Sequence, residues 1–173
     1  MKKLTLPLSR ADIALLKAGD AVSLSGVAFT ARDCANKRII KLLDNGEKLP
    51  FDLYGATIYY AGPCPAKPND AVGSCGPTTS ARMESFAPRL LDMGLRSIIG
   101  KGEMCDEVRK ALVRNKAVYF AAVGGAGALY GSRISKCECI AFPELLSEAV
   151  YRLEITDFPV IVAMDANGES VFD

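Results

Sequence analysis

The chain has 173 residues, a formal net charge of +1 and 50% hydrophobic residues. This length predicts one domain, residues 1–173, and the apolar content is too high for a disordered chain. The near-neutral charge argues against nucleic acid or an anionic membrane as a partner. The sequence contains no histidine, which excludes every Ser-His, Cys-His and His-metal mechanism on this chain alone.

The lack of a recognisable targeting signal and the cysteine usage predict a cytoplasmic protein. No apolar segment of signal-peptide length follows Met1, and the longest apolar run, 117–130, is too short to span a bilayer. Disulfides are one interpretation of the six cysteines, but we expect reduced, mostly buried thiols in a chain without a secretion signal. The cysteine spacing gives no sign of the three or four thiolates that an iron–sulfur site needs, so we expect no metal on this chain.

Periodicity and turn residues predict alternating strands and helices. The first stretch is predicted to contain a helix capped by Ser9 and ending at Gly19, a strand over 21–27, a helix over 32–43 and a strand over 56–61. The middle is predicted to contain a helix from about 80 to 94 with a kink at Pro88, a strand over 97–99, a helix over 103–114 and a strand over 117–123. The last stretch is predicted to contain a strand over 134–141, a short helix over 143–150, and strands over 153–155 and 160–163. The fold class is therefore α/β.

Three glycine-marked junctions place polar residues where a strand gives way to a helix. They are residues 26–38, 76–82 and 100–102. Such junctions expose backbone N–H groups and the positive end of a helix, which suit an anion. Thr78 and Arg82 are four residues apart, so a helix would place both on one face. The plainer interpretations are that the threonines cap a helix and that the arginines are ordinary surface cations.

Taken together, these strings resemble a known family. They are Thr-Ala-Arg-Asp at 30–33, Tyr-Ala-Gly-Pro at 60–63, Gly-Pro-Thr-Thr-Ser-Ala-Arg-Met at 76–83, Ile-Ile-Gly-Lys-Gly at 98–102, Gly-Gly at 124–125 and Asp-Phe-Pro at 157–159. The set is similar to the β subunit, or C-terminal domain, of the iron–sulfur-dependent hydro-lyases, class I fumarase and L(+)-tartrate dehydratase. The resemblance covers essentially the whole chain and implies a compact swivelling β/β/α-type domain with a mixed sheet and flanking helices.

The resemblance also implies a divided active site. A 4Fe–4S cluster would lie on a partner α subunit, and Arg32, Arg82 and Lys101 of this chain would bind the carboxylates of a C4 dicarboxylate. Thr78 would lie near the carbon that loses its proton, and Asp33 would orient Arg32 or cap the next helix. Because the chain begins at its own Met1, we expect a separate subunit in an α2β2 complex.

One position departs from the family pattern. The first motif commonly reads Arg-Asp-x-x-His, and this chain has Asn36 in place of the histidine. An amide donates and accepts hydrogen bonds but carries no proton at neutral pH. Either that histidine is not the essential acid or base, or the substrate or mechanism is shifted, or activity is lost. Asn36 stays a candidate catalytic residue, and the intact remaining positions favour retained activity.

The function that the resemblance implies is reversible hydration of fumarate to (S)-malate by the assembled hydro-lyase. The alternatives are the β subunit of an L(+)-tartrate dehydratase and a non-catalytic subunit that stabilises or regulates its partner. A free-standing anion-binding domain is a further alternative.

Overall fold

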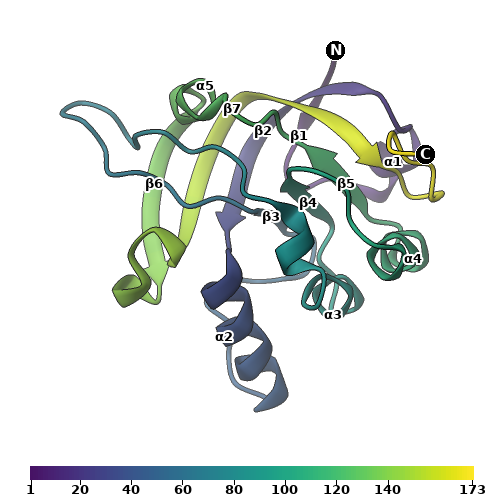
Figure 1. Cartoon of the computed structure of the whole chain (residues 1–173), viewed down its shortest axis with the longest axis horizontal. Coiled ribbons are helices and arrows are strands. Elements are labelled where there is room, and N and C mark those ends of the chain that lie inside the picture. The colour runs from purple at the N-terminus through teal and green to yellow at the C-terminus, as the bar shows by residue number, and fades with distance from the viewer.

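The computed structural model describes residues 1–173 and contains one mixed sheet of seven strands with flanking helices (Figure 1). The strands are β1 (Lys2–Thr5), β2 (Ala21–Thr30), β3 (Thr57–Tyr59), β4 (Ser97–Gly100), β5 (Val118–Ala121), β6 (Ile134–Ala141) and β7 (Val150–Met164). The helices are α1 (Arg10–Ala14), α2 (Asp33–Asp44), α3 (Ala87–Asp92), α4 (Asp106–Asn115) and α5 (Gly127–Ser132), with 3-10 helices η1 (Ser80–Met83) and η2 (Pro143–Glu148). The predicted α/β class, with a mixed sheet and flanking helices, is confirmed.

Five of the strands close into a ring. The strand order is β1-β2-β3-β4-β5-β7-β6, and β7 also pairs with β2. Neighbouring strands from β1 to β5 are parallel, whereas β7 runs antiparallel to β2, β5 and β6. The ring therefore consists of β2, β3, β4, β5 and β7, and β1 and β6 extend the sheet on either side of it.

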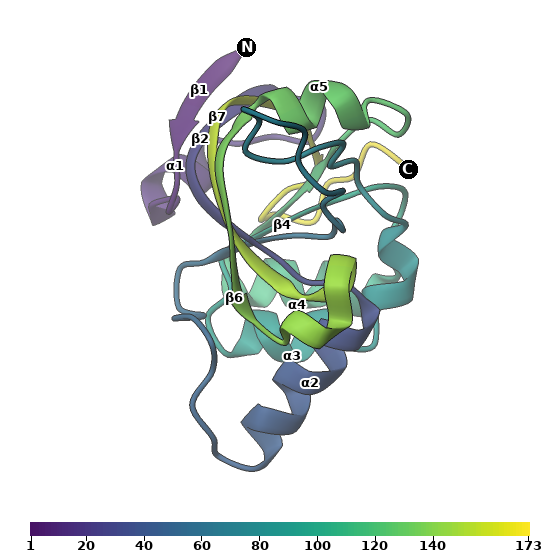
Figure 2. The same cartoon turned by 90° about the vertical axis from the view of Figure 1, so that its left-hand side faces the viewer.

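Side chains alternate between two hydrophobic clusters along the ring strands, as a strand's two-residue period requires. In β3, Tyr59 belongs to the first cluster, and its neighbours Ile58 and Tyr60 belong to the second. Helices α2, α3 and α4 lie together on one side of the sheet (Figure 2) and bury Ile39, Leu90 and other apolar residues in the second cluster. This packing fixes the start of α2 against the ends of the strands.

The structure corrects the two strands predicted over 153–155 and 160–163. Residues 150–164 form the single strand β7. Asp157 takes a positive φ of 47°, and its backbone N–H donates to Ser25 Oγ at 3.0 Å. Pairing with β2 continues on both sides of this irregular point, so a local bulge replaces the predicted interruption.

The helix predicted from about 80 to 94 is also wrong, because two separate elements replace it. Residues 80–83 form η1, and α3 begins only at Ala87. Pro88 lies in the first turn of α3 rather than at a kink, since a helix start leaves its N–H groups unpaired and proline lacks one. Helix α5 was missed because its sequence, GALYGS, contains two poor helix formers.

The predicted cap at Ser9 and the predicted strand over 134–141 are confirmed. Ser9 and Asp12 form a reciprocal capping box, and β6 has the predicted bounds. All six cysteines are unpaired, but only Cys75 is buried, so the expectation of mostly buried thiols is wrong. No helix has the combination of length and apolar character needed to cross a membrane.

Candidate functional site

The candidate site lies at one edge of the ring, where four parallel strands end. In the sheet register, Thr30, Tyr59, Ile99 and Phe120 lie side by side on β2, β3, β4 and β5. Parallel strands place their carboxyl ends at a common edge, which is where open α/β sheets bind ligands. The segments that follow these strands carry Arg32, Gly62, Lys101 and Gly124, in the same order. The sheet thereby gathers the predicted motifs at one edge.

The long loop after β3 returns to this edge and places Thr78 there. Pro77 forms a bridge with Ala61, and the Thr78 N–H donates to the Tyr60 carbonyl at 2.7 Å. Thr79 then forms a parallel bridge with Lys101. Backbone pairing therefore places Thr78 between the end of β3 and the segment after β4.

Arg82 contacts two other predicted residues. Its Nη2 donates to Thr78 Oγ1 at 2.7 Å, and its Nε lies 3.2 Å from Asp33 Oδ1. The predicted pairing of Thr78 with Arg82 is present, although Thr78 precedes the 3-10 helix η1 instead of lying on an α-helix. Asp33 pairs with Arg82 rather than Arg32, and Arg32 occupies the cap position of α2. Both roles expected of Asp33 thus differ from what the structure shows.

Arg32 lies across the backbone of Gly62 and faces Glu148. A Cβ at Gly62 would stand 3.0 Å from Arg32 Nη1 and 2.8 Å from the Ser147 carbonyl oxygen, so only glycine leaves room for the guanidinium. Arg32 Nε lies 3.6 Å from Glu148 Oε1, which is an ion pair without a hydrogen bond, and Nε has no hydrogen-bond partner. A buried N–H donor without a hydrogen-bond acceptor is typical of an arginine that binds an anion.

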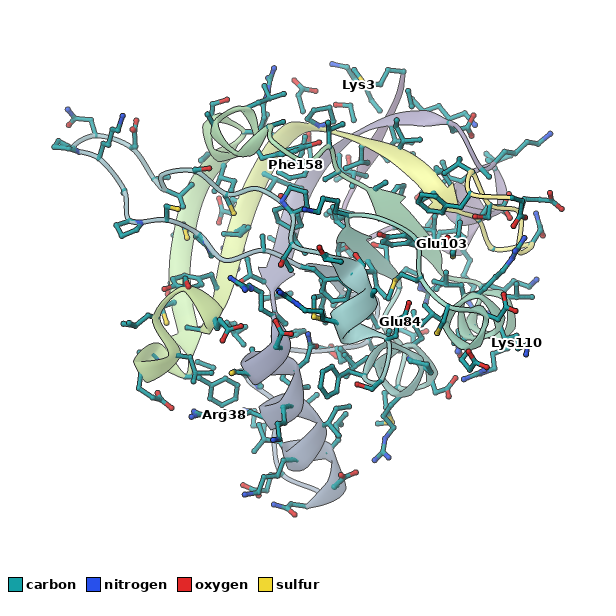
Figure 3. All side chains as sticks on the ribbon, viewed as in Figure 1. Lys3, Arg38, Glu84, Glu103, Lys110 and Phe158 are labelled. Atoms are coloured by element: carbon teal, nitrogen blue, oxygen red, sulfur yellow. The ribbon has the colours of Figure 1, made fainter.

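A second arginine of α2 holds η2 in place. Arg38, labelled in Figure 3, forms an ion pair with Glu144 and stacks over the Phe142 ring at 5.1 Å. Arg32, just before α2, and Arg38, within it, therefore contact the two ends of η2. Glu148 is the last residue of η2, and the sequence alone predicts no role for it. Its contact depends on how η2 folds back, and no local signal in the sequence gives that arrangement.

Lys101 differs from both arginines because it forms no ion pair. Its side chain lies against Gly124 after β5, where an added Cβ would stand 3.0 Å from Lys101 Cδ. Arg32 and Arg82 have carboxylate partners, and the Lys101 ammonium has none. The edge therefore presents one unpaired cation beside two arginines whose partners are partly exposed.

Asn36 lies behind this surface and is fully buried. Its Nδ2 donates to the Ala31 carbonyl at 3.2 Å, and its Oδ1 has no hydrogen-bond partner. This contact ties Asn36 to the residue that precedes Arg32, so the side chain can position the junction of β2 and α2. Direct contact between Asn36 and a substrate stays a prediction.

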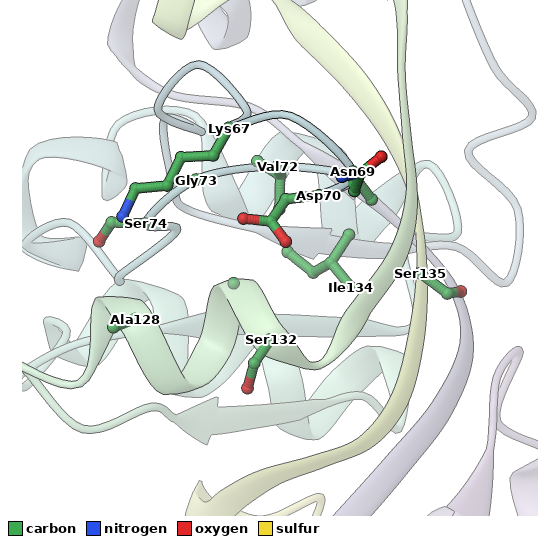
Figure 4. Close-up of a pocket in the computed structure, with 12 residues that line it drawn as sticks. Lys67, Asn69, Asp70, Val72, Gly73, Ser74, Ala128, Ser132, Ile134 and Ser135 are labelled. Carbon is green, nitrogen blue, oxygen red and sulfur yellow. The ribbon is translucent and has the colours of Figure 1, made fainter.

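The chain has no group of three or more Cys, Asp or Glu side chains that could hold a metal ion. A hollow of about 490 Å³ between the loop 67–74 and α5 lies elsewhere (Figure 4). None of the predicted site residues lines it, and its charged side chains are Lys67 and Asp70. The hollow lacks the converging cations that the sheet edge has. The chemistry that the edge can perform is anion binding beside a threonine hydroxyl.

Comparison with known proteins gives a family for the chain. A family model described as the fumarase C-terminus matches residues 2–173. A protein of Methanocaldococcus jannaschii, provisionally named L(+)-tartrate dehydratase subunit beta, is 42% identical over 96% of this chain and 88% of its own length. Fumarate hydratase 2 of Leishmania major is 35% identical over 94% of this chain and 29% of its own.

The aerobic class I fumarate hydratase of Escherichia coli K12 is 36% identical over 87% of this chain and 28% of its own length. The chain thus spans less than a third of these two fumarate hydratases and most of the tartrate dehydratase subunit. All three relatives are named as hydro-lyases, enzymes that add or remove water.

Proposed function

Because the chain belongs to the fumarase C-terminus family, we propose that it is the β subunit of a two-subunit iron–sulfur hydro-lyase. The assembled enzyme hydrates fumarate reversibly to (S)-malate. The observation that carries the proposal is the convergence of Arg32, Arg82, Lys101 and Thr78 on one sheet edge. We further propose that residues 1–173 act as one domain in the cytoplasm.

The cations bind the two carboxylates of the substrate. A guanidinium takes a carboxylate through two parallel hydrogen bonds, and an ammonium acts as a point charge. Arg32 has an unpartnered buried Nε, and Lys101 has no carboxylate partner, so both can accept an anion without breaking a hydrogen bond. Arg82 can bind the substrate while it keeps its bond to Thr78 Oγ1.

Thr78 transfers the proton from and to the substrate carbon next to a carboxylate. Loss of a proton next to a carboxylate builds a doubly charged aci-carboxylate, which preorganised positive charge stabilises. The hydrogen bond from Arg82 stabilises a negative Thr78 oxygen more than a neutral hydroxyl. The same guanidinium can therefore assist the base and bind the substrate. In the hydration direction, the Thr78 hydroxyl returns the proton to the carbon.

The side chains of this chain do not fit an iron–sulfur cluster, since they form no metal-binding group. We propose that the partner α subunit holds the cluster, which acts there as a Lewis acid when present. The name of the M. jannaschii relative, a subunit beta, supports a partner subunit. An α2β2 complex is the stoichiometry we propose.

L(+)-tartrate dehydration is the second candidate. The M. jannaschii relative matches along nearly its whole length and carries that name. Tartrate has one more hydroxyl than malate, and the three cations at the edge bind the carboxylates that both substrates share. Residues that distinguish the two substrates are therefore to be sought on the α subunit as well.

The test is an anaerobic assay of fumarate hydration and tartrate dehydration. The chain is assayed alone and after mixing with the α subunit of the same organism carrying a reconstituted cluster. We expect activity only in the mixture. A cluster-loaded complex that turns over neither substrate would contradict the proposed activity and favour a stabilising or regulatory subunit.

A further inference from the structure

The Gly100–Gly102 segment, which carries Lys101, is held by hydroxyl groups that have no assigned role. The Lys101 N–H donates to Ser80 Oγ at 2.9 Å, and the Lys101 carbonyl accepts from the Ser80 N–H at 3.0 Å. The Tyr119 hydroxyl lies 3.0 Å from the same Ser80 Oγ and donates to the Gly102 carbonyl at 2.7 Å. Backbone groups on both sides of the Lys101 side chain are therefore bound to two side chains.

Ser80 and Tyr119 are both fully buried, and Gly100 is shaped around them. A Cβ at Gly100 would lie 1.9 Å from Ser80 Oγ, so the serine hydroxyl occupies the space that any other residue would need. Burial raises the pKa of Tyr119 to about 12. Its hydroxyl therefore keeps its proton, and remains a donor to Gly102, across the pH range of enzyme assays.

We propose that Ser80 and Tyr119 are positioning residues that fix the Lys101 backbone, and through it the Lys101 ammonium, at the carboxylate-binding edge. The ammonium has no ion-pair partner of its own to hold it. Its direction depends on the backbone of residues 100–102 and on the contact with Gly124. The inference rests on the proposed function, because Lys101 binds a substrate carboxylate there.

The experiment compares Ser80→Ala and Tyr119→Phe with Ser97→Ala in the cluster-loaded complex. Ser97 is a matched control because it is equally buried and its hydroxyl bonds Thr57 Oγ1 at 2.7 Å, at the opposite end of β4. Loss of a binding interaction raises KM with little change in kcat. We expect Ser80→Ala and Tyr119→Phe each to raise KM about tenfold, with kcat within threefold, and Ser97→Ala to leave KM unchanged.

A double-mutant cycle separates positioning from general damage. Coupled residues give non-additive effects, so Ser80→Ala should change KM less than twofold when Lys101→Ala is already present. A full tenfold rise in that background would overturn the inference. An equal rise in KM for the Ser97→Ala control would overturn it as well.

Hydrogen exchange provides a readout without activity. Ser80→Ala removes the acceptor of the Lys101 N–H, so that amide should exchange at least tenfold faster than in Ser97→Ala. Unchanged protection of the Lys101 amide would overturn the inference even in an active enzyme. If the wild-type complex turns over neither dicarboxylate, the proposed activity fails, and the exchange rates still decide whether Ser80 holds Lys101.

Discussion

Arg82 is the residue on which most of the proposed chemistry converges, because it contacts both Thr78 and Asp33. In the assembled enzyme, Arg82→Ala should lower kcat/KM at least hundredfold, a loss of about 2.7 kcal/mol in transition-state stabilisation. The variant loses a carboxylate ligand and the hydrogen bond to the proton-transfer hydroxyl together. Steady-state kinetics on fumarate and tartrate would measure the loss.

Arg89→Ala is the matched control for this change. Arg89 is also exposed, and it pairs with Asp44 away from the sheet edge, so its removal should leave kcat/KM within twofold. Unchanged activity in Arg82→Ala would instead support a subunit that only stabilises or regulates its partner.

The family resemblance implies that Asn36 stands where a histidine is common. Its side chain is buried and donates to the Ala31 carbonyl, and an imidazole N–H can supply that donor. We therefore expect Asn36→His to leave kcat within about tenfold, equivalent to roughly 1.4 kcal/mol of barrier. A gain of several hundredfold would show that the asparagine impairs the natural enzyme.

The candidate residues could be predicted from the sequence, but their contacts could not. Local strings such as Thr-Thr-Ser-Ala-Arg give residue types and spacing, which a resemblance can translate into roles. The partner of Arg32 is Glu148, 116 positions later in the sequence, and such a pairing depends on tertiary folding. The same reason explains why Asp33 was expected at Arg32 and is found at Arg82.

At the scale of elements, an ion pair joins α3 and α4. Asp92 accepts from Arg114 Nε and Nη2, each at 2.7 Å. These hydrogen bonds hold the pKa of Asp92 below its ordinary value of 3.8. A lowered pKa means that the pair stabilises the fold above the unfolded-state pKa, and that this contribution is lost as the pH falls through the folded-state pKa.

Asp92→Asn should accordingly lower the free energy of unfolding at pH 7 by about 0.5–1 kcal/mol, a small value because both side chains are half exposed. The free energies of unfolding of Asp92→Asn and wild type should become equal as the pH falls below 3.8. Urea unfolding at several pH values measures them. Asp44→Asn, which removes a single hydrogen bond from Arg89, should have a smaller effect, and a pH-independent loss in Asp92→Asn would contradict the ion-pair explanation.

Element types were predictable where the hydrophobic period was regular, as in α2. The failures occur where backbone geometry is irregular. In β7 the chain passes Asp157 at positive φ and continues its pairing, and long-range partners on β2 and β6 supply the hydrogen bonds that make this possible. Tertiary pairing overrides the local hydrophobic pattern there.

At the scale of the whole molecule, ring closure explains why the chain gathers its candidate binding residues at one edge. Four parallel strands end together, and β7 closes the ring antiparallel to β2 and β5, with its first residues beside Thr30 at that edge. The edge is open on this chain, and its arginines face Glu148 and Asp33. A substrate that binds there must compete with these carboxylates for the two guanidinium groups.

The isolated chain should therefore bind a C4 dicarboxylate only weakly. Titration calorimetry with succinate, which cannot be hydrated, should give a Kd weaker than about 1 mM, corresponding to less than roughly 4.1 kcal/mol. Screening by water at partly exposed cations limits the affinity. The complex with the α subunit should bind succinate at least tenfold more tightly, because covering the edge lowers the local dielectric and strengthens each charge interaction. Micromolar affinity of the chain alone would contradict a site divided between two subunits and would favour a free-standing anion-binding domain.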